Sequence, residues 1–161
     1  MARLGPLVIR LALGVIFFAH GAQKMLGWWG GAGFSTTVEA FTKQGMPAPV
    51  AMLVIAAEFF GGMGVFFGCL TRFAAFGIAA VMTGAIFLVH IHNGFFMNWF
   101  DAPGVKNGFE CNLGYLAMAV SLMLTGAGPL SIDRLRGGKW TDLDAEEARA
   151  RASHGAPRKL S

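Results

Sequence analysis

Four apolar segments, each about as long as a lipid bilayer is thick, constrain the fold of this chain more than any other feature. A spanning helix needs about 20 mostly apolar residues, since each residue adds about 1.5 Å of length. The segments that meet this requirement cover residues 7–26, 49–70, 73–90 and 112–128, the last being short and extending back toward Phe109. Hydrophobic residues make up 55% of the 161 and charged residues only 14%, whereas soluble domains carry about 25% charged residues. We therefore predict an all-α protein built on a four-helix transmembrane bundle.

The first apolar segment follows a basic start, as the apolar run of a signal peptide does. No clean cleavage site of small residues precedes a polar mature chain, however, and three further apolar segments follow. We therefore interpret residues 7–26 as a retained first span. Arg10, near its start, is expected to extend its side chain back to the lipid headgroups.

The connections between the segments are rich in aromatic residues. Trp28 and Trp29 are the pair expected where a helix leaves the bilayer. Residues 34–44 predict a short helix lying in the membrane plane, capped by Ser35 or Thr36. The connection over residues 91–111 is long, aromatic and glycine-rich. The expected fold therefore adds short interfacial helices in the outer loops to the bundle.

The lysines and arginines near the segment ends predict the orientation. One side would carry both termini and the Thr71–Arg72 turn, with six basic residues against three on the other side. The six are Arg3, Arg10, Arg72, Arg134, Arg136 and Lys139, and the three are Lys24, Lys43 and Lys106. This bias places both termini in the cytoplasm. We expect a multi-pass protein of the bacterial cytoplasmic (inner) membrane, with no nucleic-acid partner because no nucleic-acid motif accompanies these charges.

The composition changes after the last apolar segment. Residues 1–132 are expected to form the membrane domain, and residues 133–161 a charged cytoplasmic tail that is partly disordered. One short solvated helix in the tail would be capped between Thr141 and Asp144.

Glu58 lies about nine residues into the second segment, roughly 14 Å from its outer end and so near the bilayer midplane. A charged carboxylate facing lipid there is costly, so Glu58 is expected to face the bundle, to be protonated or to pair with a base. It could relay protons, anchor a ligand or act as a hydrogen-bonding hub. The alternative is a protonated glutamate that joins two helices.

Other ionisable side chains cluster on the outer side of the predicted topology. We expect one pocket open to the outer leaflet, with Glu58 at its floor and Trp28 or Trp29 near its rim. The residues expected to line it are His20, Lys24, His90 and Glu110, with His92 the weakest candidate.

Each of these side chains also has a purely structural interpretation. Lys24 could extend to the outer headgroups, and His20 and His90 could be interfacial histidines. Glu110 could favour the start of its helix through the helix dipole. The histidines and carboxylates could together hold zinc or iron, but no HExxH or paired His-x-x-His spacing is present, and we predict no metal site.

Glycines and cysteines bear on packing and chemistry. Gly64 with Gly68, and Gly77 with Gly84, predict a close approach of the second and third spans. Cys69 and Cys111 fall at opposite membrane faces, about 30 Å apart, whereas a disulfide needs Cα atoms within about 7 Å. This spacing, and the lack of a CxxC motif, argue against an internal dithiol–disulfide oxidoreductase.

Several sequence pieces, taken in order, resemble the DoxX family of small bacterial membrane proteins. They are HGAQK at 20–24, PAPVAMLVIAAEFFGGMGVFFG around Glu58, TRFAAFGIAAVM, HIHNGFF, Glu110 and GAGPLSID. The likeness covers about residues 5–135 and leaves out the tail after Lys139. It implies a four-helix protein of the cytoplasmic membrane. Members are commonly described as oxidoreductases, mostly without a demonstrated reaction; some relatives are subunits of a thiosulfate:quinone oxidoreductase and others associate with redox-defence partners.

Together these features predict a quinone-linked redox protein or a subunit of one. His20 or His90 would donate to a quinone carbonyl, Lys24 would stabilise the reduced anion, and Glu58 with Glu110 would move protons. No haem, flavin or iron–sulfur motif is present, so a redox partner protein or a substrate would supply electrons. Two alternatives stay open: a non-catalytic scaffold that recruits partner proteins, and a small transporter that uses Glu58 as its proton-coupled group. The sequence decides neither whether the chain is catalytic on its own nor its oligomeric state.

Overall fold

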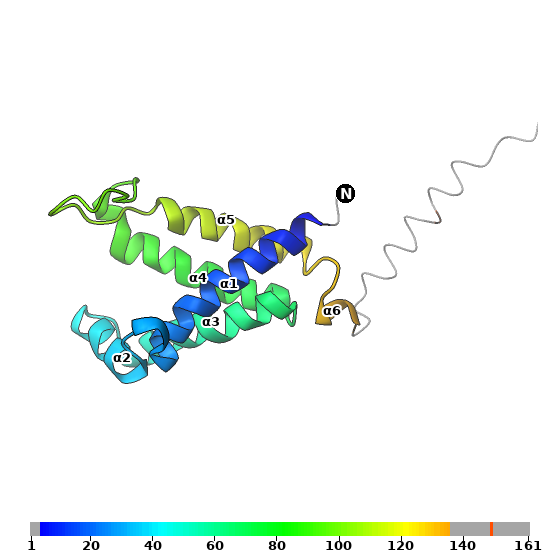
Figure 1. Cartoon of the computed structure of the whole chain (residues 1–161), viewed down its shortest axis with the longest axis horizontal. Coiled ribbons are helices and arrows are strands. Elements are labelled where there is room, and N and C mark those ends of the chain that lie inside the picture. Colours follow the sequence, from blue (N-terminus) through cyan, green and yellow to red (C-terminus); the bar gives the residue numbers. More distant parts are fainter. Residues whose placement is uncertain (1–3, 136–148, 150–161) are drawn as a thin grey trace, which may run out of the picture.

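The computed structural model describes residues 4–135 and Arg149, and every regular element in residues 4–135 is helical (Figure 1). The α-helices are α1 (Gly5–Leu26), α2 (Phe34–Lys43), α3 (Ala48–Phe67), α4 (Thr71–Ala85), α5 (Glu110–Thr125) and α6 (Ile132–Leu135). The 3₁₀ turns η1 (Trp28–Gly30) and η3 (Ile91–Asn93) and the π-helical turn η2 (Ile86–His90) complete the set. The predicted all-α class is confirmed for this part of the chain.

Three helical stretches in the described residues are long and apolar enough to cross a membrane. They are Gly5–Leu26, Ala48–Phe67 and Thr71–Asn93, the last joining α4 to η2 and η3. Helix α5 has 16 residues and falls short of that length, because the chain leaves the helical conformation at Gly126, where φ is 78°. The fourth span and the interfacial position of α2 therefore stay predictions.

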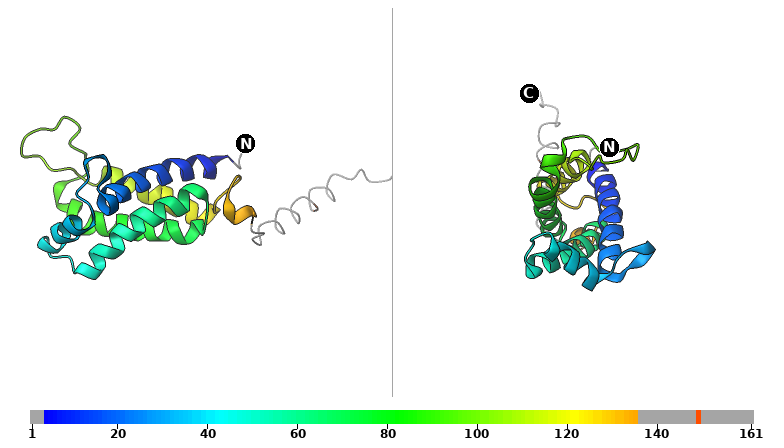
Figure 2. Two further views of the ribbon diagram at one scale, coloured as in Figure 1. Left: turned by 60° about the horizontal axis from the view of Figure 1, so that its bottom comes forward. Right: turned by 90° about the vertical axis from the view of Figure 1, so that its left-hand side faces the viewer.

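The four long helices close into a bundle around a common interior, seen along its length in Figure 2. Helix α1 packs against α3 and α5, and α4 packs against the same two helices. The start of α1 and α6 lie at one end of the bundle, and α2 and the loop before α5 lie at the other (Figure 1). Both described ends of the chain thus share one end of the bundle; that this end faces the cytoplasm stays a prediction.

The tightest helix contact joins α1 to α3 through glycines. A Cβ atom on Gly14 would lie 2.7 Å from the Cα of Phe66, and one on Gly62 would lie 2.8 Å from the carbonyl carbon of Phe17. By contrast, a Cβ on Gly84 of α4 would meet nothing within 4 Å. The expected close approach of the second and third spans is therefore absent at Gly84. It is present at Gly64, where a Cβ would lie 3.1 Å from the Cβ of Ala74. The closest backbone contacts, however, are those between the first and second spans.

The entry into α2 differs from the sequence prediction. Ser35 and Thr36 do not cap this helix, which begins at Phe34 after Gly33, and no side-chain cap is present. Gly33 has a φ of 76°, a conformation that glycine adopts without strain, and its N–H donates to the carbonyl of Gln23 at 3.2 Å. The tight glycine-rich turn thus sets the start of α2 and folds it back toward α1. Pro49 lies in the first turn of α3, where a proline costs no helical hydrogen bond.

Arg10 does not extend to the headgroups as predicted. Only 2% of its surface is exposed, and its Nη2 donates to the carbonyl of Leu130 at 2.8 Å. Its guanidinium packs against Gly68, where any Cβ would clash with it. The segment after α5 covers this arginine because it folds back across the end of the bundle.

Asp133 holds that segment in place. Its carboxylate accepts hydrogen bonds from the N–H groups of Leu70, at 2.7 Å, and Thr71, at 2.9 Å, and its own N–H donates to Gly68 at 2.8 Å. The described fold therefore continues through α6 to Leu135. The predicted boundary between membrane domain and tail at residue 132 stays a prediction. Apart from Arg149, the predicted tail from residue 136 on, with its helix near Thr141, lies outside the described residues.

Candidate functional site

Lys24 of α1 and Glu58 of α3 form an ion pair inside the bundle. The Lys24 Nζ donates to Glu58 Oε2. The Glu58 side chain is only 7% exposed, whereas that of Lys24 is 27% exposed. The pair therefore connects a buried carboxylate to an ammonium group that keeps some access to the surroundings.

The glycine contact between α1 and α3 brings the two charges together. A Cβ on Gly21 would lie 2.8 Å from the carbonyl carbon of Glu58, so only a glycine lets the two backbones meet here. Lys24 follows Gly21 by three residues and therefore shares its face of the helix. The long lysine side chain can then reach along α3 to the carboxylate.

A buried pair of this kind is a weak source of stability. Taking both charges out of water costs free energy that their attraction only partly returns, and an apolar pair of similar size is often as stable. Removing one partner alone is different, because it leaves an uncompensated charge in the interior. This balance makes the pair a better candidate for a functional element than for a structural one.

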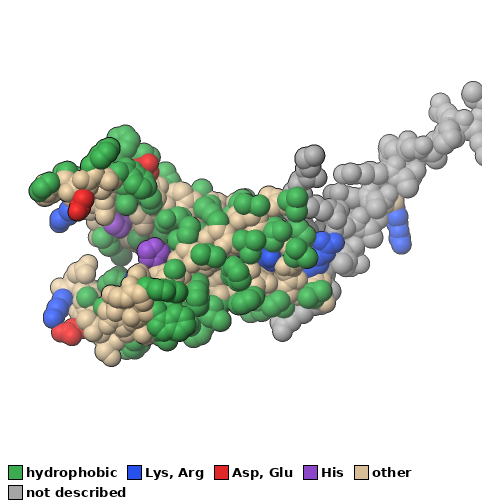
Figure 3. Space-filling view, in the orientation of Figure 1, with side chains coloured by type: hydrophobic (Ala, Val, Ile, Leu, Met, Phe, Trp, Pro, Cys, Tyr) green, Lys and Arg blue, Asp and Glu red, His purple; other side chains and the backbone are tan. Residues whose placement is uncertain are grey.

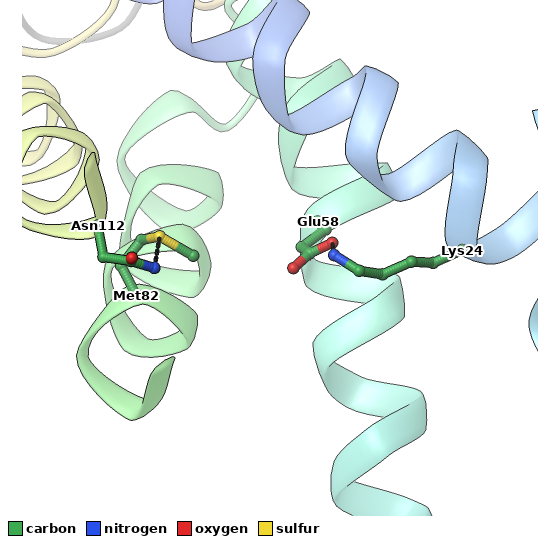
Figure 4. A network of polar contacts seen from close by, with 4 residues as sticks. All are labelled: Lys24, Glu58, Met82 and Asn112. Atoms are coloured by element: carbon green, nitrogen blue, oxygen red, sulfur yellow. Dashed lines mark hydrogen bonds and ion pairs between the residues drawn. The ribbon is translucent and has the colours of Figure 1, made fainter. Parts of the chain in front are cut away.

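Two further side chains face the pair from the other helices. The Asn112 amide of α5 donates to the Met82 sulfur of α4 at 3.6 Å. Figure 4 shows that Asn112 and Met82 lie across the interior from Glu58 and Lys24, with the two groups pointing toward one another. Each of the four long helices thus contributes one side chain to this site.

The positions of these four residues follow from the periodicity of the core. Seven residues make two helical turns, so residues seven apart lie on the same side of a helix. Each site residue stands seven positions from a buried core residue on its own helix. The pairs are Phe17 and Lys24, Ala51 and Glu58, Ala75 and Met82, and Asn112 and Ala119. The four side chains of the site therefore lie on the sides of their helices that carry the core.

His90 and Glu110 have partners in the loop before α5. The Nδ1 of His90 lies 3.0 Å from the carbonyl of Asn107, and Glu110 Oε2 accepts from the N–H of Met97 at 3.1 Å. Backbone hydrogen bonds, such as Gly108 N–H to Phe96 at 3.0 Å, tie the same loop together. These two predicted site residues therefore order the loop, and their interactions are separate from the Lys24–Glu58 pair.

The remaining predicted site residues are exposed. The side chains of His20 and His92 make no hydrogen bond or ion pair with other described residues. Trp28 is 49% exposed and packs edge-on against Phe18, with ring centroids 6.5 Å apart. Figure 3 shows histidine side chains beside a hollow between α2 and the loop before α5. The structure thus brings Lys24 and Glu58 together in the interior and leaves His20, His92 and Trp28 outside it.

Sequence reasoning missed Asn112 and Met82 because it searched for ionisable side chains. The available signal was the core periodicity of α5, in which Asn112, Tyr115, Ala119 and Leu122 follow one another at alternating spacings of three and four residues. Within the described residues, no three His, Cys, Asp or Glu side chains lie close enough to hold a metal ion. Cys69 and Cys111 are free thiols.

Comparison with known proteins gives consistent results. The family model for DoxX matches residues 5–91. The "Putative oxidoreductase CatD" of Bacillus subtilis (strain 168) is 33% identical over 130 residues, which are 81% of this chain and 85% of that protein. The "Inner membrane protein YqjF" of Escherichia coli (strain K12) is 35% identical over 137 residues, 84% of this chain and 95% of that protein. No solved structure matches the chain.

Proposed function

The chain belongs to the DoxX family of membrane proteins, and from this premise we propose that it is a quinone-linked redox protein, or the membrane subunit of one, in the bacterial inner membrane. The observation that carries the proposal is the Lys24–Glu58 ion pair, buried in an apolar bundle and faced by an amide and a thioether. A relative that carries the name oxidoreductase, and another named as an inner membrane protein, support the class and the location.

Quinone chemistry needs three things that this site offers. A quinone is an apolar ring, so it partitions into a bundle lined by aliphatic and aromatic side chains. Its carbonyl oxygens accept hydrogen bonds, and the Lys24 ammonium keeps N–H donors beyond the one that it gives to Glu58. Its reduction consumes protons, for which a buried carboxylate is a suitable relay.

The roles of the two charged residues follow from the reaction. Reducing a quinone to a quinol adds two electrons and two protons, and both carbonyls become hydroxyls. Negative charge that develops on a carbonyl oxygen would be stabilised by the Lys24 ammonium. The Glu58 carboxylate would take up a proton from the outer water, past the partly exposed Lys24, and pass it to that oxygen. A second uptake and transfer would supply the second proton. The electrons would come from a redox partner protein or a reduced substrate, because the chain carries no haem, flavin or iron–sulfur motif.

The exposed residues would serve the approach to the site. His20 lies on α1 one turn before Lys24, and Trp28 lies just beyond the end of that helix. In this proposal a quinone would enter from the outer leaflet past both side chains. His90 and Glu110 would keep the loop over this entrance in one conformation, because each is hydrogen-bonded to a loop atom.

The test is quinone binding by the full-length protein in lipid nanodiscs. Saturable quenching of tryptophan fluorescence by a short-chain quinone, beyond that due to lipid partitioning, is expected for the native chain. Binding should weaken in Lys24→Met and Glu58→Gln. The matched control is Lys43→Met, since Lys43 forms an exposed ion pair with Glu39 at 2.7 Å, far from the interior. Unchanged binding in both site variants would contradict the proposal.

The same preparation separates the two alternative functions. A proton-coupled transporter would show proton uptake into sealed vesicles that depends on Glu58 and needs no quinone. A scaffold would show neither activity and would retain its partner proteins in Glu58→Gln. Quinone-dependent electron flow from co-purified partners, lost in Glu58→Gln, is the result expected for a redox subunit.

A further inference from the structure

We propose that Asn112 is the second hydrogen-bonding wall of this site, which binds the quinone carbonyl opposite the one bound by Lys24. The site would therefore select 1,4-quinones over 1,2-quinones. This inference rests on the proposed quinone-linked function. It assigns a ligand contact and a substrate preference to a residue on α5, the last of the four long helices.

The Asn112 amide has hydrogen-bonding capacity that the protein does not use. A primary amide carries two N–H donors and an oxygen that can accept twice. In the part of the chain that the structure describes, its single partner is the Met82 sulfur, at 3.6 Å. Thioether sulfur is a weak acceptor. An amide left so poorly paired inside a membrane bundle is suited to a ligand that brings a carbonyl oxygen.

The position of Asn112 aims this amide at the interior. Asn112 stands seven residues before Ala119, which is fully buried in the core. One turn further along α5, the ring of Tyr115 packs edge-on against Phe17 of α1, with centroids 5.8 Å apart. This contact fixes the face that α5 turns toward α1. Figure 4 shows the resulting arrangement, in which the amide points toward Glu58 from the opposite side.

Donors on two facing walls match one isomer of quinone better than the other. A 1,4-quinone carries its carbonyl oxygens at opposite ends of a flat ring, so one oxygen can meet the Lys24 ammonium and the other the Asn112 amide. A 1,2-quinone carries both oxygens on one edge and can meet only one wall.

The structural alternative is that Asn112 and Met82 only hold α4 and α5 together. In that case replacing Asn112 and replacing Met82 should change the affinity for the quinone equally, because both residues belong to the same contact. If Asn112 binds the quinone, replacing Asn112 should lower the affinity for the quinone far more than replacing Met82. Met82→Leu, which keeps the apolar volume and the Asn112 donor, is therefore the matched control.

The experiment compares anthraquinone with phenanthrenequinone, isomers that carry their carbonyls in the 1,4 and 1,2 arrangements. Binding of each is measured on the full-length protein in nanodiscs. The native chain should prefer anthraquinone. Asn112→Leu should lower that affinity about tenfold, as expected for one lost hydrogen bond, and leave phenanthrenequinone binding unchanged. Met82→Leu should keep the native preference. If Asn112→Leu does not fold, Asn112→Thr, which shortens the polar group, takes its place.

The outcomes distinguish the two proposals. If neither isomer binds the native chain, the quinone-linked function fails. If both isomers bind and Asn112→Leu lowers the two affinities equally, or leaves both affinities unchanged, the quinone site stands and the role of Asn112 is refuted. Equal loss of anthraquinone affinity in Asn112→Leu and Met82→Leu would also refute it, in favour of the structural contact.

Discussion

Gly21 of α1 lies directly against Glu58 of α3, so that a Cβ atom on the glycine would come within 2.8 Å of the glutamate's carbonyl carbon. This contact sets the depth at which Lys24, one turn further along, meets the Glu58 carboxylate. Gly21 thus determines where the Lys24–Glu58 ion pair is formed. The geometry of the candidate site is therefore sensitive to helix packing.

Gly21→Ala should destabilise the protein and loosen the Lys24–Glu58 pair. The added methyl group would overlap the α3 backbone, and overpacking of this kind costs about 1–3 kcal/mol. Gly84→Ala is the matched control, because nothing lies within 4 Å of a Cβ at that position and alanine is the better helix former. Thermal unfolding in one detergent would compare the two. A Gly21→Ala variant as stable as the native chain would show that α1 and α3 do not touch there.

The ion pair makes a prediction that a double-mutant cycle can check. Lys24→Met leaves the buried Glu58 without its partner and should cost about 3 kcal/mol. Glu58→Leu alone should cost less, because Lys24 is partly exposed and can turn toward water. The double variant should recover most of the stability, since it leaves no buried charge. Lys43→Met, on the exposed Lys43–Glu39 pair, should change stability by less than about 1 kcal/mol. Additive effects of the two site substitutions would mean that the residues do not interact.

Much of the fold could be predicted because it depends on local sequence. A run of apolar residues identifies a membrane helix wherever it packs, and the predicted segments coincide closely with α1, α3, α4 and α5. Lys24 and Glu58 could be singled out one by one, since a charge in an apolar segment is conspicuous. Their pairing could not be derived in the same way, because it depends on which helix faces which.

The differences from prediction have physical causes. His90 and Glu110 lie at the end of the bundle where the sequence predicts them. Their partners, however, are backbone groups of a loop, and a loop has no periodic sequence pattern from which its contacts could be predicted. Arg10 was expected at the headgroups because a basic residue near a helix end usually reaches water. Here a segment about 120 residues later folds over it, and no local pattern encodes such a contact.

Asp133→Ala should release the segment that follows α5. The carboxylate satisfies the N–H groups of Leu70 and Thr71 at the start of α4, and loss of such a cap costs about 1–2 kcal/mol. Release would also uncover the buried Arg10. We expect a lower unfolding temperature and faster proteolysis between α5 and α6. Lys106→Ala, in the exposed loop before α5, is the control. Unchanged proteolysis in Asp133→Ala would show that the segment is held by other contacts.

The membrane position of α5 gives the last prediction. If α5 crosses the bilayer, a reporter at Gly104, before it, and one fused after Ser161 lie on opposite sides of the membrane. If α5, with its 16 residues, stays on one side, both reporters lie on the same side. We expect opposite sides, with Gly104 outside and Ser161 in the cytoplasm, because α5 lies alongside α4 and α1 and the basic residues are concentrated near the chain ends. Paired alkaline phosphatase and fluorescent protein fusions would measure this. A reporter at Ser161 on the outer side would reverse the orientation, and both reporters on one side would leave three spans.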